Sequence, residues 1–587
     1  MMDLMMRKRI GFEALAVGLC FFSYFLLGSA NVVFNVKHKF EARERRSLAA
    51  LKAHDDRRHG RSLAAVDLPL GGNGSPTDTA LYYTEIGLGT PPKDYYLQVD
   101  TGSDIMWVNC AGCENCPKKS DLGVELRLYD LKGSTTGALL TCDQDFCIET
   151  FNPTGCKVGA MCPYQVTYGD GSSSLGYFVS DNIQLNRASG NLQTTPMNGS
   201  VAFGCGAKQS GQLGTSAQAL DGILGFGQAN SSMISQIASA GKVKKMFAHC
   251  LDGTNGGGIF AIGQLVQPKL NSTPMVPNQA HYNVILKTVK VGRELLQIST
   301  DVLDSDAGAS MVIDSGTTLA YLADELYNPL ITKVMASQPN LKLHTVEQQF
   351  TCFQFTENVV RAYSSNDEST KSSAERKLKC GKNGNDTSLF PKDGCVDDGF
   401  PAVTFGFENS LSLTIYPREY LFQIRVREGL VLGFGEIGAE IKNVVGLLAV
   451  NEGSVFVNHD DVGSGKTLRW WFLEEVKEKE PSRENYETEG EDDVWCVGWQ
   501  NSGISKDGKE MNLLGDMVLS SKLVLYDLEN QTIGWTEYNC SSSVKVKDEQ
   551  SGAEYLIGPH DLSSFCSRNT GWSVTLFFLL AIMHNYM

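Results

Sequence analysis

Short runs in which apolar and polar residues alternate occur along most of the chain, and glycine or proline separates them. Residues 82–88, 95–99 and 164–168 are examples, each rich in aromatic or β-branched side chains. Such runs predict β-strands. Helical patterns are few, and the best of them is residues 323–329. The chain is therefore expected to be all-β, and a doubly wound nucleotide-binding fold, in which helices alternate with strands, is disfavoured.

One of these apolar runs occurs twice. Residues 97–103 read Leu-Gln-Val-Asp-Thr-Gly-Ser, and residues 311–317 read Met-Val-Ile-Asp-Ser-Gly-Thr. An apolar-apolar-Gly triplet follows each copy further along, at 223–225 and at 513–515. An internal repeat of this kind indicates two lobes related by duplication. The length of 587 residues, more than one hydrophobic core usually supports, agrees with two lobes.

The repeat supplies two candidate catalytic residues, Asp100 and Asp314. A strand that runs into Asp-Thr/Ser-Gly places a carboxyl group at a tight turn, where glycine permits close backbone approach. Two such loops meeting at a pseudo-two-fold axis would bring the carboxyl groups together, and the pair would then share one proton. The ionised carboxylate can act as a general base on water while the protonated one polarises a peptide carbonyl. The sequence thus predicts peptide-bond hydrolysis at acidic pH.

The residues around the two aspartates are expected to support them. The second hydroxyl residue of each copy is placed to hydrogen-bond an outer carboxylate oxygen and to keep the pair coplanar. The alternative, two unrelated β-turns, does not explain why both copies share the same lead-in and the same downstream triplet. The expected supporting residues are Thr101, Gly102, Ser103, Ser315, Gly316 and Thr317.

These motifs resemble those of the pepsin-type (A1) aspartic endopeptidases, and more narrowly the atypical plant group with a glycosylphosphatidylinositol (GPI) tail. The resemblance covers roughly residues 80 to 540, apart from one stretch. It implies a bilobal β fold with a cleft between two pseudo-two-fold-related lobes, protein or peptide substrates, a monomer, and neither metal nor other cofactor. The matching segments are 100–108, 168–173, 221–227, 314–318 and 513–516.

The same resemblance implies a flap that closes over the substrate. Tyr168, followed by Gly169, would be the flap tyrosine, and Trp107 would be its hydrogen-bond partner. Two plainer interpretations stay open: Trp107 as a core aromatic residue, and Tyr168 as an ordinary hairpin tyrosine.

Cysteines are concentrated between residues 110 and 162. Zinc or an iron–sulfur cluster would use such spacing in the cytosol. Behind a signal peptide, disulfides are favoured; losing Cys20 with the signal and Cys566 with the tail leaves 14 of the 16 cysteines, enough for seven bonds. The stretch resembles the Cys-rich insertion of the nepenthesin-like plant enzymes. The clustered residues are Cys110, Cys113, Cys116, Cys142, Cys147, Cys156 and Cys162.

The N-terminal region carries two expected segments. Residues 1–30 combine a basic start, an apolar run and a small-residue end, which predicts a secretory signal peptide, with a membrane anchor as the alternative. Residues 31–75 are rich in basic residues. This segment is either a solvated charged helix or a propeptide, and we favour a propeptide that pairs with carboxylates at neutral pH and is released by acidification.

Residues 541–587 are expected to be a linker followed by a GPI-attachment signal. The final apolar run, 574–583, is shorter than the roughly 20 residues that a spanning helix needs. Small residues precede it, so Ser563 or Ser564 is the expected attachment (ω) site. The expected location is the secretory pathway and then the outer face of the plasma membrane, or secretion to the cell wall. Six sequons agree with secretion, at Asn198, Asn230, Asn271, Asn385, Asn530 and Asn539.

One stretch, 426–492, does not fit the expected lobes at 76–275 and 276–540. It passes from a Gly-rich apolar segment to a charged run and contains no cysteine. Its flanks, joined directly, would make a typical segment of the resembled family. It is either a tolerated surface loop or translated intron, and we favour the intron.

Net charge and the intact motifs narrow the possible functions. The formal net charge of -16 makes nucleic acid an unsuitable partner and predicts an acidic surface. A pepsin-like protein that has lost catalysis and serves as a binding or inhibitor protein is the main alternative, but such proteins usually have an eroded catalytic motif. A membrane-bound structural glycoprotein would explain the tail and not the paired motifs.

Overall fold

The computed structural model describes nine stretches of the chain. They are residues 63–77, 81–151, 156–299, 310–339, 341–346, 350–354, 399–424, 494–503 and 511–562. The expected signal peptide, most of the expected propeptide, the stretch 426–492 and the two candidate ω serines lie outside the described residues.

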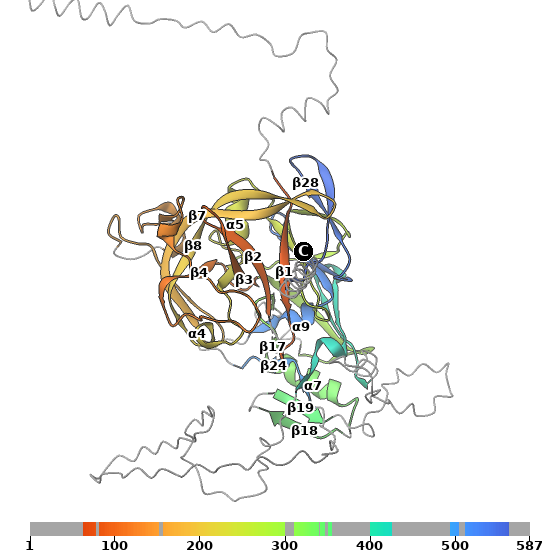
Figure 1. Cartoon of the computed structure of the whole chain (residues 1–587). Helices are drawn as coiled ribbons and strands as arrows, with labels where there is room; N and C mark the ends of the chain where they lie inside the picture. The colour runs from red at the N-terminus through yellow and green to blue at the C-terminus, as the bar shows by residue number, and fades with distance from the viewer. Residues whose placement is uncertain are drawn as a thin grey trace, which may run out of the picture. The chain divides into compact units, whose positions relative to one another are not determined.

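β-strands dominate the described residues, as the alternating pattern predicts (Figure 1). The largest sheet has 14 strands and contains the N-terminal lobe. Its path is β13-β27-β26-β10-β11-β1-β2-β3-β9-β4-β8-β7-β5, and β6 also pairs with β7. The strands are β1 (Val66–Asn73), β2 (Leu81–Leu88), β3 (Lys93–Asp100), β4 (Trp107–Glu114), β5 (Ala138–Leu139), β6 (Pro163–Thr167), β7 (Ser173–Gly190), β8 (Gln193–Ser210), β9 (Gly222–Gly225), β10 (Met246–Leu251), β11 (Gly258–Ile262), β13 (Ser272–Pro274), β26 (Lys522–Asp527) and β27 (Thr532–Glu537).

The C-terminal lobe is built on an eight-stranded sheet with the path β21-β20-β14-β16-β25-β17-β24, in which β15 also pairs with β14. A four-stranded sheet, β18-β19-β23-β22, accompanies it. The strands are β14 (Asn283–Val291), β15 (Glu294–Leu295), β16 (Ser310–Ile313), β17 (Ala320–Leu322), β18 (Leu343–Val346), β19 (Phe350–Gln354), β20 (Val403–Phe407), β21 (Ser412–Ile415), β22 (Leu421–Ile424), β23 (Val494–Val497), β24 (Trp499–Asn501) and β25 (Asn512–Leu514).

The helices of the described residues are short, and the longest covers the pattern at 323–329 that predicted a helix. They are α3 (Asp145–Phe151), α4 (Gln212–Thr215), α5 (Met233–Ser239), α7 (Asp324–Met335) and α9 (Asp516–Leu519), with the 3₁₀ turns η1 (Leu131–Gly133), η2 (Glu408–Ser410) and η3 (Pro417–Glu419). The all-β, bilobal prediction is therefore confirmed.

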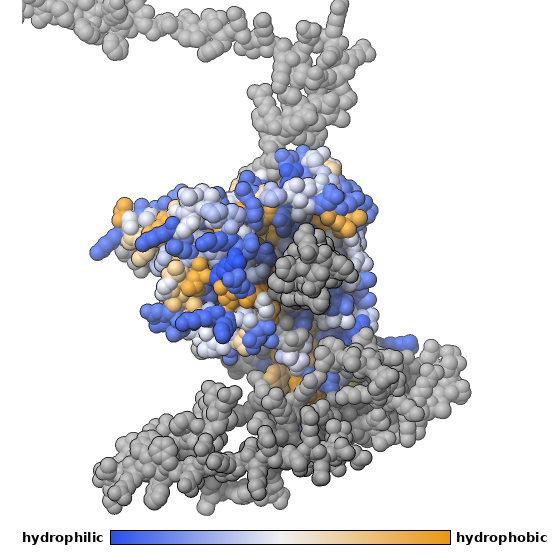
Figure 2. Space-filling model, viewed as in Figure 1, coloured by the Kyte–Doolittle hydropathy of each residue, from blue (hydrophilic) through white to orange (hydrophobic). Residues whose placement is uncertain are grey.

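Period-two burial explains why these segments are strands. In β20, Val403, Phe405 and Phe407 are buried while the residues between them are partly exposed. Successive side chains of a strand point to opposite faces, so this alternation buries one face and leaves the other near solvent. Figure 2 shows mostly polar residues on the visible surface, with apolar residues gathered near the middle of the N-terminal lobe, where Figure 1 shows β3 and β4.

The two lobes share one sheet. β10, from the first half of the chain, pairs antiparallel with β26, from the second half, with Phe247 opposite Tyr526. The hydroxyl of Tyr282, at the start of the second lobe, donates to the carbonyl of Phe226 at 2.6 Å. Because main-chain and side-chain bonds join the lobes at their base, the loops that they carry are held in a defined relation.

Two segments differ from the sequence-based division into domains, the first of them at the N-terminus. β1 lies within the range expected for the propeptide, yet it pairs with β2, β7 and β11 in the large sheet. Val66, Leu68 and Leu70 are buried there. The N-terminal lobe thus begins before the expected residue 76, because these apolar residues complete its core.

The second is the expected linker after residue 541. β28 (Val544–Asp548) and β29 (Ala553–Ile557) form a hairpin that pairs with β12 (Gln264–Gln267) in a three-stranded sheet (Figure 1). Asp548 is fully buried and accepts two hydrogen bonds from Arg187 of β7, at 2.8 and 3.0 Å. Residues 541–562 are consequently part of the fold rather than a linker.

The cysteines of the 110–162 cluster form disulfides, as expected, and none of them is left over for a metal. The structure describes six disulfides, and Cys380 and Cys395 lie outside the described residues. The six are Cys110–Cys205, Cys113–Cys116, Cys142–Cys156, Cys147–Cys162, Cys250–Cys540 and Cys352–Cys496.

Candidate active site

Each predicted catalytic aspartate lies at the end of a strand that has a parallel neighbour. Asp100 ends β3, which runs parallel to β9, and Asp314 follows β16, which runs parallel to β25. The downstream triplets found in the sequence are these two neighbouring strands. The registers match: Val99, directly before Asp100, lies opposite Leu224, and Ile313, directly before Asp314, lies opposite Leu514. The two copies of the repeat therefore occupy equivalent positions.

The two aspartates face each other across the lobes, each against the other loop's glycine. A Cβ atom on Gly102 would lie 2.6 Å from Oδ2 of Asp314, and one on Gly316 would lie 2.1 Å from Oδ1 of Asp100. Both distances are too short for a side chain, so the close approach of the carboxyl groups requires glycine at both positions.

The hydrogen bonds of the two loops match atom for atom. In each loop the glycine N–H donates to Oδ1 of the aspartate, and the hydroxyl of the next residue donates to Oδ2. The bonds are Gly102 N to Asp100 Oδ1 (2.8 Å), Gly316 N to Asp314 Oδ1 (2.7 Å), Thr317 Oγ1 to Asp314 Oδ2 (2.7 Å), and Ser103 Oγ to Asp100 Oδ2. Ser103 and Thr317 thus lie where the sequence predicted, each on an outer carboxylate oxygen.

The loops are also bonded to each other. Ser315 N donates to Oγ1 of Thr101 at 2.8 Å, and both residues are buried. Gln98 adds a second link, since its Nε2 donates to the carbonyl of Gly316 at 3.2 Å. Gln98 was not among the predicted residues, because nothing in the local pattern shows that its side chain reaches the other lobe.

The surroundings of Asp100 shift its pKa. Burial, followed by the charge of Asp314, raises the pKa of Asp100 to about 7, against the opposing effect of the hydrogen bonds from Ser103 and Gly102. A carboxyl group with such a pKa keeps its proton in acid. This is the asymmetric protonation that the chemistry needs.

A third carboxyl group, which the sequence reasoning left without a role, lies next to the pair. Asp516 follows the second downstream triplet and is buried. Burial, and then the charges of Asp314 and Asp100, raise its pKa well above the ordinary value, so it is neutral in acid. Among the described residues its Oδ1 has no hydrogen-bond partner. The signal that could have identified it is the contrast with Phe226, which follows the first triplet.

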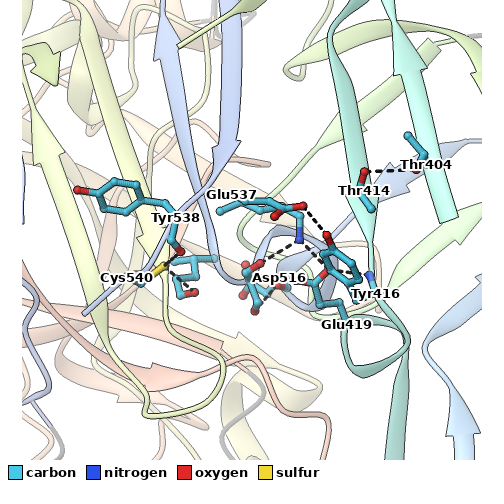
Figure 3. A network of polar contacts seen from close by, with 11 residues as sticks. Thr404, Thr414, Tyr416, Glu419, Asp516, Glu537, Tyr538 and Cys540 are labelled. Carbon is cyan, nitrogen blue, oxygen red and sulfur yellow. Dashed lines mark hydrogen bonds and ion pairs between the residues drawn. The ribbon is translucent and has the colours of Figure 1, made fainter. Parts of the chain in front are cut away.

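A buried ion pair anchors the turn that carries Asp516 (Figure 3). Lys522 Nζ lies 2.8 Å from Oε2 of Glu419, and both side chains are almost fully buried. Nζ also donates to the carbonyl of Ser520, whose hydroxyl donates to the carbonyl of Asp516 at 2.8 Å. Removing one partner of such a pair leaves an unpaired buried charge. The pair therefore fixes α9 against η3.

The predicted flap residues come together. Tyr168 lies in the turn between β6 and β7, with its N–H donating to the carbonyl of Ser172 at 2.9 Å. Trp107 Nε1 donates to the Tyr168 hydroxyl at 2.7 Å. Burial and the charge of Asp100 raise the pKa of that hydroxyl, which places it near the first aspartate. Gly169 is exposed at the turn. Trp107 is also packed in a core cluster, so it is both a core residue and the hydrogen-bond partner of Tyr168.

The chemistry available at this site is that of paired carboxyl groups. Within the described residues, no group of three or more His, Cys, Asp or Glu side chains is arranged to hold a metal ion. The facing carboxyl groups, one with a raised pKa, can hold and activate a water molecule. The geometry thus defines an aspartic-type peptidase site.

Comparison with known proteins identifies the family. Residues 82–264 match the family described as "Xylanase inhibitor N-terminal" and residues 281–367 match "Xylanase inhibitor C-terminal". "Aspartic proteinase 36" of Arabidopsis thaliana is 42% identical over 561 residues, covering 95% of this chain and 94% of that protein. "Aspartic proteinase 39" of the same plant is 39% identical, covering 91% of this chain and 90% of that protein.

Among solved structures, the one titled "Crystal structure of edgp" superposes with a TM-score of 0.51 at 17% identity, covering 82% of this chain and 96% of that one. This likeness shows the fold alone. The two Arabidopsis relatives show more: the chain belongs to the plant branch of the pepsin-like (A1) aspartic proteinases. It is an aspartic-type endopeptidase.

Proposed function

We propose that this endopeptidase cleaves protein or peptide substrates at acidic pH with a water molecule held between Asp100 and Asp314. The observation that carries the proposal is the matched hydrogen bonding of the two loops, which presents two carboxyl groups in equivalent positions. The ionised carboxylate takes a proton from the water, and the protonated one donates to the scissile carbonyl. Ser103 and Thr317 orient the outer oxygens, and Tyr168 covers the substrate.

Cleavage of a denatured protein at about pH 4 tests this mechanism, a range chosen from the shared proton. Wild type, Asp100→Asn and Asp121→Asn should be compared, since Asp121 is an exposed aspartate with no role in the site. We expect wild type and Asp121→Asn to cleave and Asp100→Asn to be inactive. Full activity only above pH 8 would contradict the shared-proton mechanism.

A catalytically silent binding or inhibitor protein is the alternative function. The two matched families carry inhibitor names, but the relatives that align along nearly the whole chain are named proteinases. Both dyad loops are also complete here. If wild type and Asp100→Asn both failed to cleave while the flap and dyad geometry stayed intact, the binding protein would be the better proposal.

We propose that residues 1–30 are a signal peptide and that a basic propeptide follows. Because β1 belongs to the large sheet, we place the end of the propeptide before Leu63 rather than at residue 75. N-terminal sequencing of the secreted, acid-treated enzyme tests this. A mature N-terminus after residue 73 would show that β1 is removed, and one at residue 31 would show that there is no propeptide.

We propose GPI attachment at Ser563 or Ser564, and with it a location on the outer face of the plasma membrane. In the part of the chain that the structure describes, no helix has both the length and the apolar character to cross a bilayer. Ser563 and Ser564 are small residues that precede the apolar run 574–583, the order expected of an attachment signal. Release from intact cells by a phosphatidylinositol-specific phospholipase C is the expected result. Resistance to the lipase, with the protein free in the medium, would favour simple secretion.

The secreted enzyme is further proposed to be a glycosylated monomer. The five described sequon asparagines, Asn198, Asn230, Asn271, Asn530 and Asn539, are all exposed. Treatment with peptide N-glycosidase should lower the apparent mass of the secreted protein, and light scattering should then give the mass of one chain. An unchanged mass after the enzyme would remove the glycosylation proposal.

For residues 426–492 we propose translated intron rather than a functional loop. The strands on either side, β22 and β23, pair antiparallel with Ile424 opposite Val494, and a disulfide joins Cys352 to Cys496 next to them. The described strands that flank the stretch are therefore already paired, and a chain without it could connect them as a hairpin. A spliced message that lacks the stretch, and an active protein with 426–492 deleted, are expected. An inactive deletion variant would favour the loop.

A further inference from the structure

Two oppositely charged side chains are buried near the second aspartate loop. Nζ of Lys522, the first residue of β26, lies 2.8 Å from Oε2 of Glu419 in η3, and the two side chains are 1% and 5% exposed. Taking two charges out of water costs free energy, and an apolar pair of similar size is often at least as stable. The pair therefore needs an explanation other than stability, namely a bond that an apolar side chain could not make.

That bond closes the turn that follows α9. Nζ of Lys522 reaches back two residues and donates to the carbonyl of Ser520 at 3.1 Å. Ser521, between them, has a φ of 57°, in the left-handed region where an L side chain is crowded. Its N–H donates to the carbonyl of Leu251, the last residue of β10, at 3.0 Å. The lysine side chain thus holds an unfavourable turn in one conformation.

Hydrogen bonds connect this turn to the second aspartate through α9. Both N and Oγ of Ser520 donate to the carbonyl of Asp516, each at 2.8 Å. Asp516 N donates to the carbonyl of Thr317 at 2.7 Å, and Thr317 Oγ1 donates to Asp314 Oδ2 at 2.7 Å. The path from Lys522 to the catalytic carboxyl group therefore consists of hydrogen bonds and single residues, and none of these bonds is longer than 3.1 Å.

The acidic member of the pair is itself held in place (Figure 3). Oε2 of Glu419 also accepts from Tyr416 N at 2.9 Å, which closes η3. The Tyr416 hydroxyl donates to Oε1 of Glu537 at 2.9 Å. Next to Glu419, the carbonyl of Tyr420 accepts from Gly498 N at 2.7 Å. Glu419 is thus fixed within the C-terminal lobe, and through Lys522 it holds the turn after α9.

We propose that Lys522 and Glu419 are positioning residues for peptide hydrolysis, which hold α9 and through it keep Thr317 on the outer oxygen of Asp314. The proposal rests on the endopeptidase mechanism proposed above. Neither residue touches the reacting atoms. Without the Nζ bond the turn relaxes, and the Asp516 amide holds the Thr317 carbonyl less firmly. Asp314 is then oriented less well in the transition state, while the substrate contacts stay the same.

The double variant Lys522→Met/Glu419→Gln tests the pair, since it removes both charges and leaves neither unpaired. Glutamine keeps an acceptor for Tyr416 N. We expect kcat to fall about 5-fold, the equivalent of one hydrogen bond, with KM unchanged. The matched control is Arg187→Met/Asp548→Asn, which removes the ion pair between β7 and the β28–β29 hairpin, with bonds of 2.8 and 3.0 Å. The control should keep wild-type kcat and KM whatever its Tm.

Ser520→Ala interrupts the same path at another step and leaves the charges in place, so it covers the case in which the double variant folds poorly. It removes the 2.8 Å bond from Oγ to the Asp516 carbonyl and should lower kcat about 2-fold, since the Ser520 amide still donates to that carbonyl. A peptide with a tetrahedral hydroxyl-bearing carbon at the scissile position mimics the transition state. Its affinity should fall by the same factor as kcat in each variant.

Hydrogen–deuterium exchange separates this inference from the proposed function, because it needs no activity. The segment 314–318, which contains the Gly316 amide bonded to Asp314, should exchange faster in Lys522→Met/Glu419→Gln than in wild type and the Arg187→Met/Asp548→Asn control. If wild type fails to cleave substrates but the exchange difference is present, the proposed function fails and the coupling of the ion pair to the aspartate loop stands. If the double variant matches the control in exchange, kcat and affinity for the analogue, the positioning role is overturned.

Discussion

The segments 222–226 and 512–516, which contain the two downstream triplets, lie beside the aspartate strands in equivalent positions but differ in the chemistry of their last side chain. In the first, Gly225 is followed by Phe226, and in the second Gly515 is followed by Asp516. Phe226 packs with Phe247 and Phe260, at centroid distances of 5.0 and 4.9 Å. Asp516 instead places a carboxyl group near the aspartates. The two lobes thus share the arrangement of strands and differ in the side chain that faces the site.

Steric constraint explains which positions stayed alike. A Cβ on Gly225 would lie 2.5 Å from the carbonyl carbon of Asp104, and one on Gly515 would lie 2.3 Å from the carbonyl oxygen of Thr317. Glycine is therefore required at this position in both lobes. The next residue carries a side chain in both lobes, phenylalanine in one and aspartate in the other. The two aspartate loops are thus symmetric, whereas the side chains around them are not.

The largest expected effects test the symmetric part. Asp100→Asn and Asp314→Asn should each reduce kcat by at least about 10³-fold, because each removes one member of a pair that works as a unit. Steady-state kinetics on one peptide substrate would measure both. Losses that differ by orders of magnitude would show that one aspartate carries the chemistry and that the equivalence of the loops is only geometric.

Alanine at the loop glycines should give the next largest effects. Gly316→Ala and Gly102→Ala would place a Cβ 2.1 and 2.6 Å from the opposite carboxylate, forcing the loops apart. We expect losses of about 10²-fold, as small displacements at a reacting centre can cause, with the greater loss at Gly316. Gly199→Ala, where a Cβ meets only Ile183 at 3.6 Å, is the control. Wild-type kcat in Gly316→Ala would refute the close approach.

A smaller effect is expected at the hydrogen bond between Trp107 and Tyr168. Trp107→Phe removes the 2.7 Å bond to the Tyr168 hydroxyl and should lower kcat/KM about 5-fold, the value of one hydrogen bond. Tyr168→Phe should match it, and the double variant should lose little more, since the two share one interaction. Fully additive losses would mean that the bond is not what couples them.

The smallest effect concerns stability and pH. Because the folded protein raises the pKa of Asp516, the resulting stability is complete below the unfolded value of about 3.9 and is lost as the pH rises through the raised one. Asp100, with its pKa raised to about 7, adds a change of the same sign. Asp516→Asn should therefore flatten the fall of Tm between about pH 4 and pH 8 by a few degrees.

The slope of Tm against pH is the quantity to compare, since an asparagine in a buried site can also change the absolute Tm. Asp100→Asn should remove only the part of the slope between about pH 4 and pH 7. An unchanged slope in Asp516→Asn would mean that Asp516 is already ionised at neutral pH, and that its environment is as open as that of an ordinary surface carboxyl.

Much of the site could be predicted from the sequence because the motifs that define it are local. The Asp-Thr/Ser-Gly turns, the strand lead-ins and the Tyr168 turn each lie within a few residues, and the short period of a strand makes the alternation visible. The disulfide chemistry of the 110–162 cluster could be expected for the same reason. Its pairing could not, since cysteine spacing does not specify connectivity.

Other features could not be predicted from local sequence patterns, because they depend on residues far apart in the chain. β1 and the 544–557 hairpin looked like propeptide and linker until their strands paired with β7, β11 and β12. Gln98 and Asp516 are ordinary side chains in sequence. Sequence patterning is enough to specify strands and turns, because these follow from neighbouring residues. Which strands meet and which carboxyl group is buried depend on packing between lobes, where desolvation sets both pKa values and the cost of an unpaired polar group.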